Sequence, residues 1–304
     1  MKKSKLKTYL WLFGINFFIS AFTFLFNWTA AAAGHISRDS SWTYGGNGGL
    51  NLSQVSLSNW ASGGENAVGF DVLLNYSADY KKNKHLWQNR IEMAYGLNQT
   101  ETSGTKKTND KLYFSSTYGY GMTKSLYLSA LLNFNTQFAK GYDYKTEPRT
   151  YISRFMSPGY LTTGLGLTWN PKNWITATFS AISWRGTFVS SKILSDEGSF
   201  GVDPGEHLFS EMGGNLKVEV KYEFLKNMTI YSRVDLFSNY LEDPQNVDVR
   251  WDVQLNMTVN KWFSANISTN LIYDNDTKIV QKDGSKGPRL QFKESLGVGF
   301  QVTF

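Results

Sequence analysis

The feature that most constrains the fold is an alternation of apolar and polar side chains that recurs along the chain. In residues 247–259, VDVRWDVQLNMTV, every second residue is apolar and the residues between them are polar or charged. Successive side chains of a β-strand point to opposite faces, so this segment is predicted to be a strand with one apolar and one polar face. The same pattern recurs at residues 68–80, 87–98, 126–138, 216–224, 228–239 and 290–304, and helical spacing fits none of these segments better.

Shorter stretches with the same alternation complete a set of twelve predicted strands. They lie at residues 43–52, 112–120, 161–169, 175–181 and 263–271. The sequence therefore predicts an all-β fold made of about twelve antiparallel strands.

The connections between these strands alternate in length. Tight polar turns are predicted at residues 81–84, 123–124, 171–173, 226–227 and 260–261. Between them lie longer connections at residues 56–66, 100–110, 141–157, 187–210, 242–245 and 274–288. Short turns at one end and long loops at the other are typical of outer-membrane barrels, and an even number of strands places both termini at the short-turn, periplasmic end.

Strand length decides between a soluble sandwich and a membrane barrel. The longer predicted strands, of about 11 to 15 residues, are long enough to cross a bilayer at a tilt, whereas sandwich strands are usually shorter. The mean hydropathy is −0.35, which fits a lipid-facing surface formed by alternation. Aromatic residues near the short turns are placed as an interfacial girdle: Tyr80, Trp87, Trp169, Trp174 and Trp262. We therefore expect a single closed transmembrane barrel that contacts outer-membrane lipid.

The N-terminal region has the composition of a secretory signal peptide. A basic start, an apolar run and the small residues TAAAAG predict a signal peptide at 1–33, a periplasmic lead at 34–42 and a barrel at 43–304. The alternative is a membrane anchor, since the apolar run is nearly long enough to span a bilayer. Removal of the signal takes away four lysines and lowers the net charge from +6 to +2, which does not indicate a nucleic-acid partner.

The final strand ends on an aromatic residue. Phe300, Val302 and Phe304 share its apolar face. This arrangement resembles the C-terminal signal through which outer-membrane barrels are recognised by the barrel-assembly machinery, which is therefore an expected partner during biogenesis. A chance aromatic terminus is the alternative.

Two sequence blocks carry a resemblance to a known family. The first is NLSQVSLSNWASGGEN, with Asn51 to Gln54, Asn59, Trp60, Gly63, Gly64 and Asn66 as its main residues. The second is the terminal QFKESLGVGF with Lys293 and Glu294. With these blocks the chain resembles an uncharacterised family of outer-membrane barrels from Bacteroidota. The resemblance covers the expected mature chain and implies a Gram-negative outer membrane, but no substrate.

The polar faces of the strands carry charges of both signs. The residues predicted to line the lumen are Asp71, Asp79, Arg90, Glu92, Lys217, Glu219, Lys221, Glu223, Arg233, Asp235, Asp248, Arg250, Asp252 and Lys293. If a water-filled path remains, they form a weakly selective channel for small polar or ionic solutes. If they pair across the lumen, the barrel is plugged and serves as a structural or assembly partner in a larger outer-membrane complex. Twelve strands leave an interior wider than side chains easily fill, which favours the channel.

The first long loop contains a candidate constriction of the barrel mouth. Its residues are Asn59, Trp60, Gly63, Gly64, Glu65 and Asn66, which would fold back over the glycine-rich first strand. An ordinary compact loop explains them equally well. The glycines GGNGG at 45–49 lack the helix that a phosphate-binding loop requires.

No catalytic or metal site is predicted, and no cofactor is expected. A barrel phospholipase would need a histidine base on its outer wall, whereas His35 lies near the cleavage region, His85 at a short turn and His207 in the longest loop. Asp71 and Asp79 are interpreted as lumen lining rather than as an acid–base pair. Residues 242–245 and 274–277 carry closely spaced oxygen ligands of the kind that bind Ca²⁺, but solvated loop tips explain them better.

Overall fold

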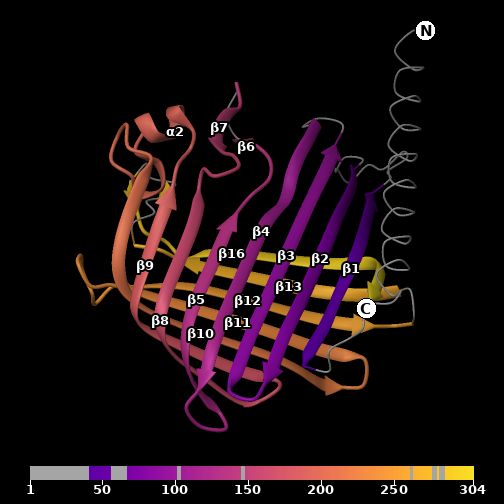
Figure 1. Cartoon of the computed structure of the whole chain (residues 1–304). Helices are drawn as coiled ribbons and strands as arrows, with labels where there is room; N and C mark the ends of the chain where they lie inside the picture. Colours follow the sequence, from indigo (N-terminus) through magenta and orange to yellow (C-terminus); the bar gives the residue numbers. More distant parts are fainter. Residues whose placement is uncertain are drawn as a thin grey trace. The chain divides into compact units, whose positions relative to one another are not determined.

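The computed structural model describes residues 41–55, 67–100, 104–144, 148–260, 263–275, 279–280 and 285–304. Residues Thr43–Thr303 form one compact unit, a closed antiparallel barrel (Figure 1). Its twelve strands are β1 (Trp42–Val55), β2 (Ala67–Lys82), β3 (His85–Thr100), β4 (Gly104–Gly121), β5 (Leu126–Thr136), β8 (Gly159–Lys172), β9 (Ile175–Phe188), β10 (Leu208–Leu225), β11 (Met228–Asn239), β12 (Val247–Thr258), β13 (Phe263–Tyr273) and β16 (Gln291–Thr303). The predicted twelve-stranded fold is therefore confirmed.

The barrel closes where its last strand meets its first. β16 pairs antiparallel with β1, from Asn47 opposite Thr303 to Asn51 opposite Gly299. The ring otherwise follows chain order, with β5 joined to β8 and β13 joined to β16. Closure leaves no unpaired sheet edge, which is the condition for strands to cross a hydrocarbon layer.

The short turns lie at one end of the barrel and the longer connections at the other. Asn83 and Asn227 occupy the turns after β2 and β10 with φ of 54° and 66°, a left-handed conformation that asparagine tolerates better than most residues. The longer connections hold the hairpins β6 (Gly141–Asp143) with β7 (Thr150–Ser153) and β14 (Ile279–Val280) with β15 (Lys286–Gly287), and the short helices α2 (Lys192–Asp196) and η1 (Ser199–Gly201). The long loop predicted at 100–110 is wrong, because β3 continues to Thr100 and β4 begins at Gly104.

A β-bulge in β9 reverses the alternation of that strand. Ser180 pairs with Asn215 of β10 and Ser183 pairs with Gly213, so two residues of β9 oppose one residue of β10. Such a bulge moves every later side chain to the opposite face. On the other side of β9, a Cβ atom at Gly166 would lie 1.9 Å from the carbonyl oxygen of Phe179, so only glycine fits there.

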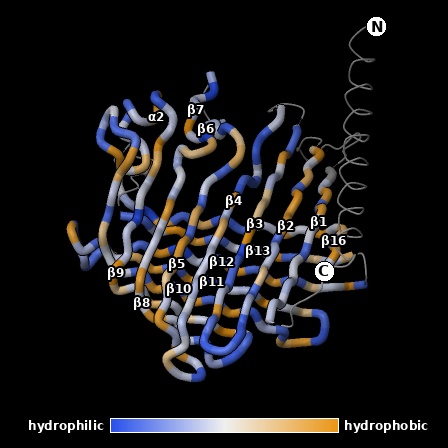
Figure 2. The backbone as a smooth tube through the Cα atoms, in the orientation of Figure 1, coloured by the Kyte–Doolittle hydropathy of each residue, from blue (hydrophilic) through white to orange (hydrophobic). Residues whose placement is uncertain are grey.

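The barrel is apolar outside and polar inside. Leu165, Ile182 and Leu296 are 60%, 62% and 70% exposed in the barrel wall, whereas Thr168, Ser180 and Lys217 are buried inside it. Figure 2 shows the resulting alternation of hydrophobic and hydrophilic residues along the strands. Within the described ranges, no helix is long and apolar enough to cross a membrane.

Aromatic side chains gather on the outer wall near the short turns. Trp87, Trp169 and Trp174 are exposed there, and the ring of Trp174 lies 5.6 Å from that of Tyr222. Tyr80 is half-buried, and Trp262 lies outside the described residues. This clustering is the arrangement expected of an interfacial girdle.

Candidate functional site

The interior of the barrel contains a buried ion pair between opposite walls. Nη1 of Arg233 on β11 lies 2.5 Å from Oε1 of Glu92 on β3. β10, β9, β8, β5 and β4 separate these two strands on one side of the ring, and β12, β13, β16, β1 and β2 separate them on the other. The pair therefore spans the lumen, and both side chains are less than 10% exposed.

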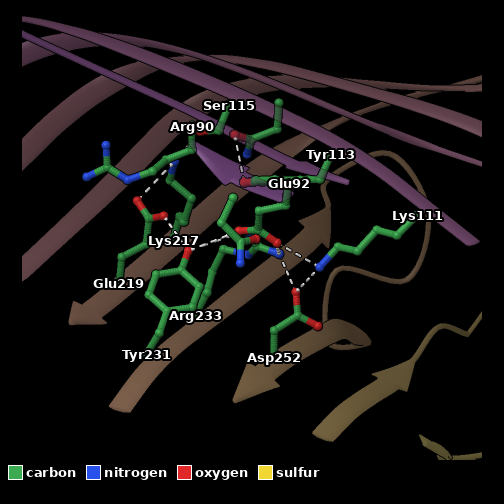
Figure 3. A network of polar contacts seen from close by, with 12 residues as sticks. Arg90, Glu92, Lys111, Tyr113, Ser115, Lys217, Glu219, Tyr231, Arg233 and Asp252 are labelled. Atoms are coloured by element: carbon green, nitrogen blue, oxygen red, sulfur yellow. Dashed lines mark hydrogen bonds and ion pairs between the residues drawn. The ribbon is translucent and has the colours of Figure 1, made fainter. Parts of the chain in front are cut away.

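Two further charged side chains, Lys111 and Asp252, contact this ion pair (Figure 3). Nζ of Lys111 on β4 contacts Oε2 of Glu92 at 2.8 Å and Oδ2 of Asp252 at 3.2 Å. Arg233 also donates through Nη2 to the same oxygen of Asp252 on β12. Two cations and two carboxylates thus neutralise one another in the middle of the barrel, so the lumen carries no net charge at this level.

Aromatic and hydroxyl groups fix the geometry of the bridge. The guanidinium carbon of Arg233 lies 3.8 Å from the ring centroid of Tyr113 on β4, a cation–π contact across the lumen. The hydroxyl of Tyr231 donates to Oε1 of Glu219 at 3.0 Å. Lys217 on β10 donates to Oγ of Ser115 on β4 at 2.7 Å and lies 3.4 Å from Glu219. We call Glu92, Lys111, Tyr113, Ser115, Lys217, Glu219, Tyr231, Arg233 and Asp252 the lumen bridge.

Residues of the lumen bridge border two cavities. The larger, of about 430 Å³, is lined by Lys111, Arg233 and Asp252 and by residues from the loop-side halves of the strands. The smaller, of about 60 Å³, is lined by Glu92 and Lys111 and by residues of β1, β2, β12, β13 and β16. The two cavities share Asn109 and Lys111 in their linings.

A second buried cluster lies closer to the long loops. Arg185 on β9 donates from Nε and Nη2 to both carboxylate oxygens of Glu211 on β10, each at 2.5 Å. Its Nη2 also lies 2.5 Å from Oδ2 of Asp248 on β12. The guanidinium lies 4.1 Å from the ring centroid of Phe237, and Arg250 lies at the same distance from the ring of Tyr160.

The remaining charges predicted to line the lumen have more local partners. Arg90 forms a two-armed ion pair of 2.5 and 3.1 Å with Asp79 on the neighbouring strand. Asp235 accepts a hydrogen bond of 2.6 Å from Asn215. Lys293 donates to Asn109 at 2.9 Å, and Asp71 lines the smaller cavity.

Lys221 and Glu223 differ from the rest of the predicted lining. Both are exposed at the short-turn end of β10. Glu223 accepts a hydrogen bond from the backbone N–H of Asn227 in the adjacent turn. The structure therefore brings neither residue into the lumen bridge.

Several central residues escaped the sequence prediction. Lys111 directly follows the segment predicted as a loop. Arg185 and Glu211 lie beyond the predicted ends of their strands. Before the bulge of β9 the even-numbered residues face inward, and after it the odd-numbered residues do, so a regular alternation places Arg185 on the outer face. A signal was present, because the polar–apolar alternation resumes from Ser183 to Phe188 in the opposite phase.

Other predicted site residues fall into two groups. The candidate mouth constriction (Asn59, Trp60, Gly63, Gly64, Glu65 and Asn66) lies outside the described residues, as do the predicted signal peptide and His35. Phe300 lies on the outer face of β16, and Phe304 follows the strand; both are about half exposed, and Val302 is half-buried. These positions fit a recognition role, which stays a prediction.

Two histidines have structural partners. Nδ1 of His85 is 2.7 Å from the hydroxyl of Tyr118, and Nδ1 of His207 is 2.6 Å from the carbonyl oxygen of Val189. Among the described residues, no group of three or more His, Asp or Glu side chains is placed to hold a metal ion.

Two family profiles match separate parts of the sequence. Residues 52–142 match a family described as "Protein of unknown function (DUF3078)", and residues 200–300 match one described as "Protein of unknown function, DUF481". Each match spans less than half of the chain. The first covers most of the NLSQ…SNWASGGEN block, and the second includes Lys293 and Glu294. Both descriptions agree with the expectation of an uncharacterised family, and neither names an activity. No curated protein matches the sequence.

Solved structures with a similar arrangement are outer-membrane proteins of low sequence identity. An outer membrane channel from Pseudomonas putida F1, described as COG4313, is 9% identical, with 89% of this chain and 100% of that chain covered and a TM-score of 0.37. The NanC porin is 10% identical, with 84% and 98% covered and a TM-score of 0.37. The translocator domain of the autotransporter NalP from Neisseria meningitidis is 9% identical, with 94% and 96% covered and a TM-score of 0.38. These values describe a distant similarity and do not bear on what this chain binds or transports.

Proposed function

We propose that the protein is a barrel of a Gram-negative outer membrane whose lumen is closed in its resting state. The outer wall supports the membrane location, because large apolar side chains are exposed along the strands and aromatic residues gather near the short turns. A soluble protein rarely leaves so much apolar surface in contact with water. A membrane barrel places the same surface against acyl chains.

The observation that carries the proposal is the lumen bridge. Arg233 and Lys111 reach carboxylates on strands across the interior, and the central groups are buried. This arrangement favours the plugged alternative over a permanently open channel. A solute or ion would have to separate several buried charge pairs, each of which is then left unpaired in a poorly hydrated interior.

Single-channel recording in planar bilayers tests the proposal. The refolded mature barrel should show no stable conductance. The double variant Arg233→Ser/Lys111→Ser should conduct, because it shortens two long cationic side chains of the bridge and leaves Glu92 and Asp252 without cations. Those carboxylates should make the current cation-selective. The matched control Lys192→Ser, which removes an exposed cation from the loop helix α2, should remain silent.

A weakly selective channel is the second candidate, and two observations favour it. Two cavities border the lumen bridge, and the larger is lined by five acidic and five basic side chains. Movement of the side chains that line both cavities, such as Lys111, would connect them without strong selection for charge. A steady wild-type conductance with similar permeability for K⁺ and Cl⁻ would establish this candidate and overturn the closed barrel.

A closed barrel would act through its loops and its lipid-facing wall. We therefore propose that its partners are other outer-membrane proteins and that outer-membrane lipid surrounds it. During insertion, the barrel-assembly machinery would recognise Phe300, Val302 and Phe304. The Bacteroidota origin implied by the NLSQ…SNWASGGEN block belongs to the same proposal. Mild detergent extraction of native membranes followed by size separation tests the partner: a stoichiometric complex supports it, and a monomeric barrel contradicts it.

We expect no enzymatic activity. Within the described ranges, neither His85 nor His207 is hydrogen-bonded to a serine hydroxyl; their Nδ1 atoms contact Tyr118 and Val189. Incubation of the refolded barrel with phospholipid vesicles should release no fatty acid. Hydrolysis abolished by His85→Ala or His207→Ala would contradict this expectation.

A further inference from the structure

The interior contains three arginines that each lie against an aromatic ring. Arg233 lies 3.8 Å from the ring centroid of Tyr113, and Arg185 lies 4.1 Å from that of Phe237. Arg250 lies 4.1 Å from that of Tyr160. In each pair the ring holds one face of the guanidinium, so the planar N–H edge stays available for a carboxylate.

Two of these arginines are neutralised by the chain itself. Arg233 binds Glu92 and Asp252, and Arg185 binds Glu211 and Asp248. Arg250 differs, because no carboxylate of the described residues lies within ion-pair distance of it. An arginine stacked on an aromatic ring therefore occurs three times, and only in the third pair does the arginine have no carboxylate of the described residues within ion-pair distance.

Arg250 lines the larger cavity, of about 430 Å³, which falls in the size range of small-molecule pockets. Besides its charged residues, this cavity is lined by neutral hydrogen-bonding side chains: Asn109, Asn135, Thr162, Asn270 and Gln291. Lys293 also lines this cavity from an inward position and is nevertheless exposed, which indicates that solvent reaches this part of the interior.

We propose that this cavity binds a small organic monocarboxylate that carries hydroxyl groups, with the carboxylate held by Arg250. The guanidinium supplies two parallel N–H donors, and the amide and hydroxyl side chains supply partners for the hydroxyl groups of the ligand. The balance of five acidic and five basic side chains in the lining disfavours a second negative charge on the ligand. This site is independent of whether the barrel conducts.

Calorimetric titration of the refolded mature barrel in detergent micelles tests the site with three six-carbon probes. Gluconate carries one carboxylate, glucarate carries two, and sorbitol carries none. Gluconate should bind at least about tenfold more tightly than either of the others, because a charge-assisted hydrogen-bond pair is worth a factor of that order. Absence of gluconate binding, or equal binding of sorbitol or glucarate, would overturn the proposal.

Variants assign the binding to Arg250. Arg250→Gln should weaken gluconate binding at least about tenfold, and Arg250→Lys should give an intermediate loss because the charge remains while the forked geometry is lost. The matched control Arg154→Gln removes an exposed arginine outside the cavity and should bind as the wild type does. Heat-dependent gel mobility checks that each variant forms a folded barrel. Unchanged affinity in a folded Arg250→Gln barrel would overturn the assignment.

Because these titrations need no bilayer, their outcome is separate from that of the conductance experiment. A silent barrel that binds gluconate supports both proposals. A conducting barrel that binds gluconate overturns only the closed lumen, and a silent barrel that does not bind overturns only the ligand site.

Discussion

Arg233 and Glu92 are 141 residues apart in the sequence and 2.5 Å apart in the structure, on strands that face each other across the barrel. This contact couples the wall containing β3 to the wall containing β11. Since both side chains are buried, each needs partners of opposite charge: Arg233 has Glu92 and Asp252, and Glu92 has Arg233 and Lys111.

The first prediction concerns the stability that depends on this pair. Arg233→Met should lower the free energy of unfolding by about 3–5 kcal/mol, because the buried carboxylates Glu92 and Asp252 then have only Lys111 as a cation between them. Urea titration of the barrel in lipid vesicles, followed by tryptophan fluorescence, measures the change.

The control for this change is Lys192→Met. Lys192 and Asp196 form an ion pair that is 82% and 50% exposed, so its removal should have little effect. Equal unfolding midpoints for Arg233→Met and the control would show that the bridge does not stabilise the barrel.

The second prediction concerns the outer wall. Leu296 is a strand residue that is 70% exposed on the outer wall. Leu296→Arg places a charge against acyl chains there, which should lower the free energy of unfolding in lipid by about 2–4 kcal/mol if the residue lies near the bilayer centre. Leu241→Arg, at a loop position that is 75% exposed, should be close to neutral. Vesicle refolding yields and urea midpoints distinguish the two variants. A wild type that stays monomeric and soluble without detergent or lipid would contradict the membrane location.

The third prediction tests the proximity of β4 and β10 inside the barrel. The natural sequence contains no cysteine, so Ser115→Cys/Lys217→Cys introduces the only two thiols of the chain. A bismaleimide with a short spacer should join the two thiols and increase the mobility of the denatured chain on a gel. Ser115→Cys/Lys226→Cys, with its second thiol in an exposed short turn, should not be joined. Equal cross-linking of both pairs would contradict the bridge.

The fourth prediction concerns the bulge of β9. Gly166→Ala should destabilise the barrel by about 1–3 kcal/mol or more, because its Cβ would overlap the carbonyl oxygen of Phe179. Gly48→Ala is the matched control, since a Cβ there would have its nearest neighbours at 3.9 Å. A folded Gly166→Ala barrel with the unfolding midpoint of Gly48→Ala would show that the bulge does not require glycine.

The alternation of side chains was sufficient to predict the strands and their faces where the ladder is regular. In β2 and β12 the period of two continues without interruption, so Asp79 and Asp252 were assigned to the inner face from the sequence. In β9 the bulge inserts one residue after Ser180, and a strict period of two then misplaces Arg185.

Partner choice could not be predicted in the same way. The position of Glu92 in its strand indicates that it faces inward, but not that Arg233 lies opposite. That relationship depends on ring closure and on the shape of the lumen, which are properties of all twelve strands together. The alternation of side chains along a strand therefore indicates which residues line the lumen, but not which of them contact one another.

The seam between β1 and β16 has a consequence for the order of assembly. Until these strands pair, the sheet remains open and water can solvate Glu92, Arg233, Lys111 and Asp252 separately. These side chains lose their hydration in the final step, when β1 pairs with β16 and the opposite walls of the barrel come together. We therefore expect closure to be the slow step of folding, with an open sheet, already hydrogen-bonded strand to strand, as the species that accumulates before it.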